Sequence, residues 1–244
     1  MKKKTYVLGM AVLVAAMLAM SGVAQSAMWV GAEIGVNGQP KIDMSVDGRG
    51  VSDSRSTGIL PRVIGGATIG YDFVNAGFGA YAWPAWMQYF SFAMDLTYNR
   101  LTVKQNFGTG AGQFFAPSSI MNGSELAWTF LFMAHYGFLR DSEVPSGRIN
   151  PYIGVGPAIV WTTIDATLPV GPPGNLINYN AGDSAMNVAL VVEPGIRWVC
   201  LPNVSIDTAF RYRYSQPSWT LNDVTLKANP LHQFAFLLRA NYHF

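Results

Sequence analysis

Apolar and polar positions alternate with a period of two along the last fourteen residues, 231–244. One set is apolar or aromatic and consists of Phe234, Phe236, Leu238, Ala240, Tyr242 and Phe244. The other set is mostly polar and consists of Gln233, Ala235, Leu237, Arg239, Asn241 and His243. Successive side chains of a β-strand point to opposite faces, so this period is typical of a strand. The stretch is predicted to be a strand with one apolar face.

The same period recurs in seven earlier stretches of the chain. They cover residues 28–36, 62–73, 88–103, 125–138, 149–164, 184–200 and 204–215. A tight turn at 201–203 joins the last two, and the connections along the chain alternate between long and short. The long connections are rich in turn-forming residues and are predicted to be exposed loops; they are 37–60, 104–124, 165–183 and 216–229.

The composition indicates that the apolar faces of the strands do not form the core of a soluble protein. Half of the residues are hydrophobic and only 12% are charged, against about 25% in ordinary soluble domains. After residue 27 no long apolar run is available for a transmembrane helix. The remaining way to cross a bilayer is a closed barrel, in which every backbone polar group is paired internally. Residues 28–244 are therefore predicted to form an all-β, eight-stranded antiparallel up-and-down transmembrane β-barrel.

Residues 1–27 have the pattern of a secretory signal peptide. Lys2, Lys3 and Lys4 precede an apolar run from Tyr6 to Met20, and small residues follow. The run is shorter than the roughly 20 residues of a spanning helix, which disfavours a membrane anchor. Cleavage is compatible with either Ala24 or Ala27. We expect export through the Sec pathway and removal of this segment.

The aromatic residues on the apolar faces are sorted by height in the predicted barrel. Near the outer end are Tyr98, Trp128, Trp161, Tyr212 and Tyr214. Near the periplasmic end are Tyr71, Phe73, Phe90, Tyr136, Phe138, Trp198, Tyr242 and Phe244. Two aromatic girdles around an aliphatic band are typical of a barrel in a bilayer, so the apolar faces are predicted to meet lipid.

Charged residues occupy the opposite faces: Glu33, Asp95, Glu193, Arg197, Asp207, Arg211, Arg213 and Arg239. The turn at 201–203 sets Arg197 opposite Asp207 and Glu193 opposite Arg211, although a bulge at Pro194 would disturb the second pair. At barrel closure Arg239 lies level with Glu33. An eight-stranded barrel is only wide enough for side chains to fill it. A structural plug of ion pairs is therefore the preferred interpretation, with a gated pore or proton path as the alternative.

Enzyme and cofactor signals are weak. The chain has three histidines, His135, His232 and His243, and none has a serine and a carboxylate nearby in the sequence. The Gly-rich stretch 108–112 lacks the strand–loop–helix context and the closing Lys of a phosphate loop. No catalytic residue, cofactor or metal site is predicted. The net charge of +2 and the absence of a basic patch argue against a nucleic-acid partner.

The chain resembles the small outer-membrane β-barrel superfamily, that is, the OmpA-like and opacity-protein-like eight-stranded barrels. The resemblance rests on residues 151–157, 205–214 and 239–244. It implies a Gram-negative outer membrane with its lipid and lipopolysaccharide, and Tyr242 and Phe244 as a signal for the barrel-assembly machinery. The His-x-Ser motif of lipid A deacylases is absent, and we expect no peptidoglycan-binding domain after Phe244.

The function predicted from the sequence is structural or surface-interacting, with the interior plugged by charge pairs. A narrow channel for small or hydrophobic solutes is the alternative, and a lipid-modifying enzyme is a third hypothesis. The four long loops are the predicted surface for an extracellular ligand. The second loop is unusually apolar, with Phe107, Phe114, Phe115, Ile120 and Met121. It is expected to fold over the barrel mouth or to contact a hydrophobic ligand or partner.

Overall fold

The computed structural model describes residues 28–48, 51–73, 83–102, 120–170, 177–221, 224–228 and 230–244. The predicted signal peptide, 1–27, lies outside the described residues. So do residues 104–119 of the second predicted loop, including Phe107, Phe114 and Phe115. No helix in the described part of the chain is both long and apolar enough to span a bilayer.

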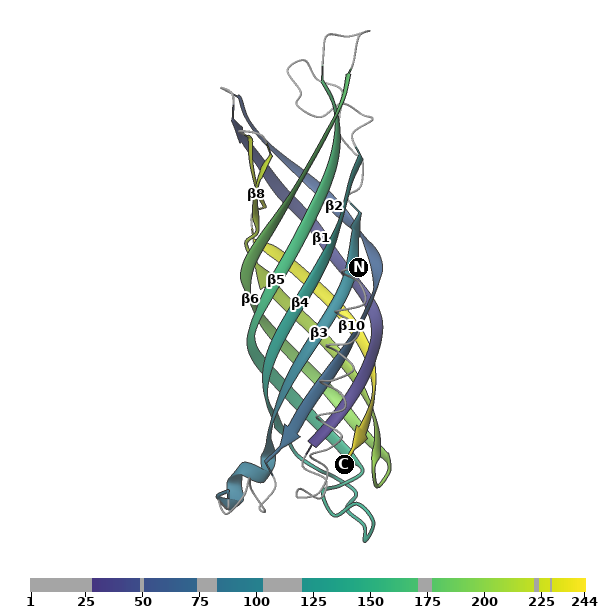
Figure 1. Cartoon of the computed structure of the whole chain (residues 1–244). Helices are drawn as coiled ribbons and strands as arrows, with labels where there is room; N and C mark the ends of the chain where they lie inside the picture. Colours follow the sequence, from purple (N-terminus) through teal and green to yellow (C-terminus); the bar gives the residue numbers. More distant parts are fainter. Residues whose placement is uncertain are drawn as a thin grey trace, which may run out of the picture.

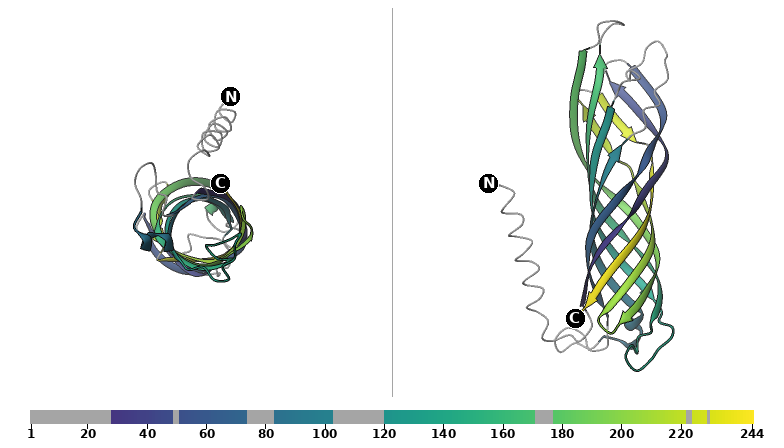
Figure 2. Two further views of the ribbon diagram at one scale, coloured as in Figure 1. Left: turned by 90° about the horizontal axis from the view of Figure 1, so that it is seen from below. Right: turned by 90° about the vertical axis from the view of Figure 1, so that its right-hand side faces the viewer.

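The described residues form a closed antiparallel barrel, which confirms the predicted fold class (Figure 1). Its eight strands are β1 (Met28–Gly48), β2 (Val51–Asp72), β3 (Phe90–Thr102), β4 (Ile120–His135), β5 (Ile149–Val170), β6 (Ile177–Leu201), β7 (Val204–Ser215) and β10 (Leu231–His243). Each strand pairs with the next, and β10 pairs with β1 to close the ring, which is seen end-on in Figure 2. The first and the last strand of the barrel therefore pair with each other and close it.

We call the end at which β1 begins and β10 ends the terminal end, and the opposite end the far end. A short 3-10 helix, η1 (Ala85–Tyr89), precedes β3 at the terminal end. The segment 139–148 connects β4 to β5 at the same end. A small hairpin of β8 (Ser218–Leu221) and β9 (Val224–Ala228) lies toward the far end, where β9 pairs with β1.

The prediction of long loops was wrong for three of the four connections and for residues 120–124 of the fourth, which belong to β4. Strands β1 and β2 stay paired up to Gly48↔Val51, through most of the predicted loop 37–60. Strands β5 and β6 stay paired up to Val170↔Ile177, inside the predicted loop 165–183. The stretch 216–229 contains the β8–β9 hairpin. Alternation of apolar and polar residues is required only where one strand face is buried, whereas backbone pairing has no such requirement.

The barrel is apolar outside and polar inside. Aliphatic side chains on the outer face are widely exposed, for example Val188 at 72% and Ile34 at 59%. The predicted girdle aromatics also lie on the outer face, and each is exposed or half-buried. Inward-facing side chains such as Glu193 and Asp207 have no exposed surface. This arrangement is the reverse of a soluble protein and is that of a barrel surrounded by lipid.

Glycines make room for the large side chains that point inward. A Cβ atom at Gly70 would lie 2.1 Å from the Trp29 ring, and one at Gly195 would lie 2.4 Å from the Tyr152 ring. Both rings come from a neighbouring strand in the ladder. The glycine content of the strands therefore serves the packing of a narrow interior.

Candidate functional site: the charged interior

The eight charged residues predicted on the inner faces are all buried, with side chains from β1, β3, β6, β7 and β10. Together with their hydrogen-bond partners we call them the interior charge network. The network has three layers: one at the centre of the barrel, one toward the far end and one toward the terminal end.

Two arginines form the central layer together with three carboxylates. Arg211 contacts Glu193 at 2.5 Å and Asp95 at 2.6 Å. Arg239 contacts Glu33 at 2.8 Å, Glu193 at 3.2 Å and Asp95 at 3.4 Å. Each guanidinium is shared by carboxylates from opposite walls, so the layer crosses the whole lumen.

Tyr152 completes the central layer on its terminal side. Its hydroxyl donates to Glu193 Oε1 at 3.2 Å and accepts from Arg239 Nη1 at 3.5 Å. The layer holds one more carboxylate than guanidinium. One carboxylate oxygen of the layer, Glu33 Oε1, has no hydrogen-bond partner within the described protein and lies 3.9 Å from Arg211 Nη1.

The layer toward the far end is smaller and balanced in charge. Arg213 donates to Glu125 Oε1 at 2.6 Å. Gln233 donates to the other carboxylate oxygen of Glu125 at 2.8 Å and accepts from Arg213 at 3.2 Å. All three side chains are buried, so this layer closes the lumen a second time.

Arg197 is the centre of the layer toward the terminal end. It donates to Asp207 at 3.2 Å and lies 3.5 Å from Asp72. Its guanidinium carbon lies 4.5 Å from the centre of the Trp29 ring. Trp29 in turn donates its indole N–H to Asp72 at 3.2 Å. The cation is thus held by two carboxylates and an aromatic face.

The structure contains the three ion pairs expected from strand parity. Arg197 is the register partner of Asp207, and Glu33 is the register partner of Arg239. The ladder between β6 and β7 is interrupted at Glu193 and Pro194, but the register is the same on both sides, so no bulge shifts it there. The one irregularity of this hairpin lies between Val199 and Leu201, which leaves a two-residue turn at 202–203 in place of the predicted three-residue turn.

Five members of the network were not predicted from the sequence: Trp29, Asp72, Glu125, Tyr152 and Gln233. Parity places all five on inner faces, so the missing signal was not their direction. Glu125, Asp72 and Trp29 lie near the ends of the apolar-polar stretches, where a partner across the lumen cannot be identified from spacing.

The three histidines do not come together. His135 and His243 face a cavity at the terminal end. His232 lies at the start of β10, toward the far end, where its Nδ1 is 2.7 Å from the Tyr212 hydroxyl in a hydrogen bond. His243 Nε2 lies 2.9 Å from Ser205 Oγ, a pair that the sequence analysis did not identify. The Ser205 side chain is fully buried. The described residues contain no group of three or more side chains suited to a metal ion.

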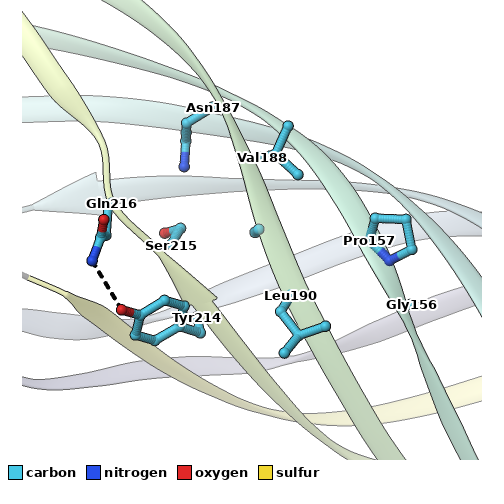
Figure 3. A pocket seen from close by; sticks show the side chains of 9 residues that line it. Gly156, Pro157, Asn187, Val188, Leu190, Tyr214, Ser215 and Gln216 are labelled. Carbon is cyan, nitrogen blue, oxygen red and sulfur yellow. Dashed lines mark hydrogen bonds between the residues drawn. The ribbon is translucent and has the colours of Figure 1, made fainter.

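The barrel wall has a side opening where β7 ends. The ladder between β6 and β7 stops at Leu190↔Tyr214. A cavity of about 570 Å³ begins there, lined by outward residues such as Val188 and inward residues such as Ala189 and Ser215 (Figure 3). Gln216 donates to the Tyr214 hydroxyl at 2.9 Å on one side of the opening. The side opening is therefore lined by residues from both faces of β6 at the point where the β6–β7 ladder ends.

The segment 139–148 carries an exposed charge cluster outside the barrel wall. Asp141 accepts the backbone N–H groups of Val144 and Glu143 and pairs with Arg148. The hydrogen bond from Val144, followed by that from Arg148, lowers the pKa of Asp141 below its ordinary value. The same ion pairs, with Asp141 and Glu143, raise the pKa of Arg148. Asp141 and Arg148 therefore stay ionised at neutral pH.

Comparison with solved structures supports the fold. The outer membrane protein OprG from Pseudomonas aeruginosa is similar at 12% identity with a TM-score of 0.52, covering 90% of this chain and 97% of that chain. Neisserial surface protein A is similar at 14% identity with a TM-score of 0.44, covering 89% and 97%. No protein-family pattern and no curated protein sequence matches the chain. The likeness to OprG therefore supports the barrel fold alone.

Proposed function

We propose that the protein is an outer-membrane barrel of a Gram-negative bacterium with a structural or surface-interacting role and no ion-conducting path. The observation that supports this is the inverted distribution of polarity. Exposed aliphatic and aromatic side chains surround the barrel, while salt bridges fill its interior. An apolar band of this kind requires lipid around it, and a narrow lumen filled with paired charges leaves no continuous space for ions.

In this proposal the terminal end faces the periplasm and the far end faces outward. Two connections at the terminal end are compact, at 202–203 and 139–148, and the third, 73–89, is long. The longest paired hairpins extend from the far end. Bacterial barrels have short periplasmic turns and longer outer extensions. Outer-membrane lipid and lipopolysaccharide, the barrel-assembly machinery and the Sec pathway are the partners that this location requires. Tyr242 and Phe244, whose rings pack edge to face, are the proposed assembly signal.

Two measurements on the purified protein test the proposal. A folded barrel should migrate differently on a denaturing gel before and after boiling. In a planar lipid bilayer the folded protein should give no stepwise conductance above background. Stable single-channel steps from the wild-type protein would refute the plug, and solubility without detergent together with unchanged migration would refute the membrane barrel.

A second candidate function is sideways passage of apolar solutes, and the side opening at the end of β7 favours it. A solute that entered from the far end could leave through this opening into lipid without crossing the interior charge network. Uptake of a small apolar fluorophore by cells that produce the protein tests this. Leu190→Trp should fill the opening and slow uptake, whereas Leu96→Trp, at an equally outward position on β3, should leave it unchanged. Equal uptake in all strains would eliminate this candidate.

A further inference from the structure

A chamber lies between the interior charge network and the terminal end of the barrel. Its volume is about 620 Å³, within the range of roughly 300–1,000 Å³ of small-molecule sites. Arg197 and Tyr152, from the network, line one side. Ser91, His135 and Asn150 line the walls. The chamber is therefore formed by strands that are far apart in the sequence.

The segment 139–148 covers the chamber at the terminal end, and we call it the closing segment. Its Val144 is only 4% exposed and lines the chamber. The segment is held in shape by the contacts of Asp141 and by Arg148, which also donates to the Cys200 carbonyl at 3.4 Å. Positive φ angles occur at Leu139 (54°) and Gly147 (103°), close to the two ends of the segment. The segment therefore forms part of the wall of the chamber at the terminal end.

The ionic groups that reach the chamber already have protein partners. Arg197 is paired with Asp207 and Asp72. Glu143 is paired with Arg148 at 2.9 Å. An additional cation would meet the Arg197 guanidinium, and an additional anion would meet Asp72 and Glu143. The electrostatics therefore favour a neutral ligand over a charged one.

Three buried polar atoms at the chamber have no hydrogen-bond partner within the described protein: Ser91 Oγ, His135 Nε2 and Arg197 Nη2. Ser91 has no exposed surface and Arg197 only 6%. The arginine nitrogen can only donate, the serine hydroxyl can donate or accept, and a neutral imidazole nitrogen accepts or donates according to its tautomer. A hydroxyl group can satisfy each of these atoms, because it is both donor and acceptor.

We propose that this chamber is a binding site for a small neutral polyhydroxylated solute, such as a polyol or a monosaccharide. Ser91, His135 and Arg197 hydrogen bond its hydroxyl groups. Tyr152 and Val144 bound the site at its two ends. The site itself does not depend on the proposed membrane role; only its exposure to the periplasm does.

The three histidines provide a direct test, because two of them line the chamber and the third lies outside it. His135 and His243 line the chamber, and His232 is exposed elsewhere. The imidazole resonances of the isotope-labelled, folded protein in detergent micelles are followed while sorbitol or glucose is added, and separately acetate or methylammonium. We expect saturable shifts of His135 and His243 with the neutral probes, little response to the charged ones, and no response of His232.

Ser91→Ala and Thr129→Val form a matched pair for this titration. Both remove a fully buried inward hydroxyl that lacks a partner, but only Ser91 lines the chamber. Losing one ligand hydrogen bond should weaken sorbitol binding by roughly 2- to 10-fold in Ser91→Ala, and Thr129→Val should bind as the wild type does. Both variants should keep heat-modifiable migration.

Three outcomes would overturn the site. One is the absence of any saturable shift, which would mean that the chamber holds water only. Another is a parallel, non-saturating response of all three histidines, which would indicate a solvent effect. The last is an equal response to acetate or methylammonium. None of these results bears on the barrel or on the plug, which the gel and conductance measurements test separately.

Discussion

The centre of the barrel and the chamber beside it are both lined by polar side chains, but they differ in how many of those side chains have protein partners. At the centre, Arg211 and Arg239 each contact several carboxylates. In the chamber, Ser91 and His135 present atoms without a partner. Buried polar groups cost free energy unless they are hydrogen bonded. Most charged groups at the centre are therefore paired within the protein and form a plug, although Glu33 Oε1 is not, whereas the chamber is suited to a polar molecule from outside.

Removing a central cation should have the largest effect. Arg211→Met leaves Asp95 and Glu193 with fewer partners in a dry environment. We expect a loss of about 3–5 kcal/mol in the free energy of unfolding, since breaking one partner from a buried pair leaves an uncompensated charge. Urea unfolding of the lipid-reconstituted protein, followed by gel migration, measures it. Arg140→Met is the matched control, because this arginine is exposed and lies over the Tyr136 ring. An equal loss of stability in Arg140→Met would show that burial among the central carboxylates is not the cause of the effect.

Replacing the other central arginine, Arg239, distinguishes a permanent plug from a gate that can open. Folded Arg239→Met should still give no stepwise conductance, because Arg211 keeps its bonds to Asp95 and Glu193 and the Arg213–Glu125 layer remains. Planar-bilayer recording of the heat-modifiable variant is the measurement. If the variant conducts, the network is a gate and the sequence-derived alternative of a gated path is correct.

Substitutions in the chamber should hardly change stability. Ser91→Ala removes a hydroxyl that has no protein partner, so we expect a change within about 0.5 kcal/mol in the free energy of unfolding. The same urea titration measures it, in the absence of added polyol. A loss comparable with that of Arg211→Met would mean that Ser91 belongs to the plug and that the two regions do not differ.

The smallest expected effect is the pH response of the closing segment. The folded-state pKa of Asp141 is lowered, first by the Val144 N–H and then by Arg148. A lowered carboxyl pKa means that the stabilisation is present above the ordinary pKa and is lost as the pH falls through the lowered value. The Val144 amide resonance should therefore titrate only at acidic pH, below the ordinary range of an aspartate. In Asp141→Asn this titration should vanish; its persistence would assign the effect to another group.

Strand parity was enough to predict much of the candidate site. Alternation identified the eight charged inner residues and, with the register of one tight turn, the Arg197–Asp207 and Glu193–Arg211 pairs. It also placed Glu33 beside Arg239 at closure. These contacts are between neighbouring strands, where the register follows from short connections. The contact of Arg211 with Asp95 spans 116 residues and crosses the lumen, so no turn length predicts it.

The sequence by itself determined the class of fold and the direction of its side chains, because a period of two depends only on the local geometry of a strand. It did not determine how far the hairpins extend, because backbone pairing continues where alternation stops. Nor did it determine the layered network, the side opening or the chamber. These depend on which side chains face each other across a closed ring, and on the path of segment 139–148 over its end. Only the tertiary structure decides distances across a lumen, since they follow from strand tilt and closure rather than from spacing along the chain.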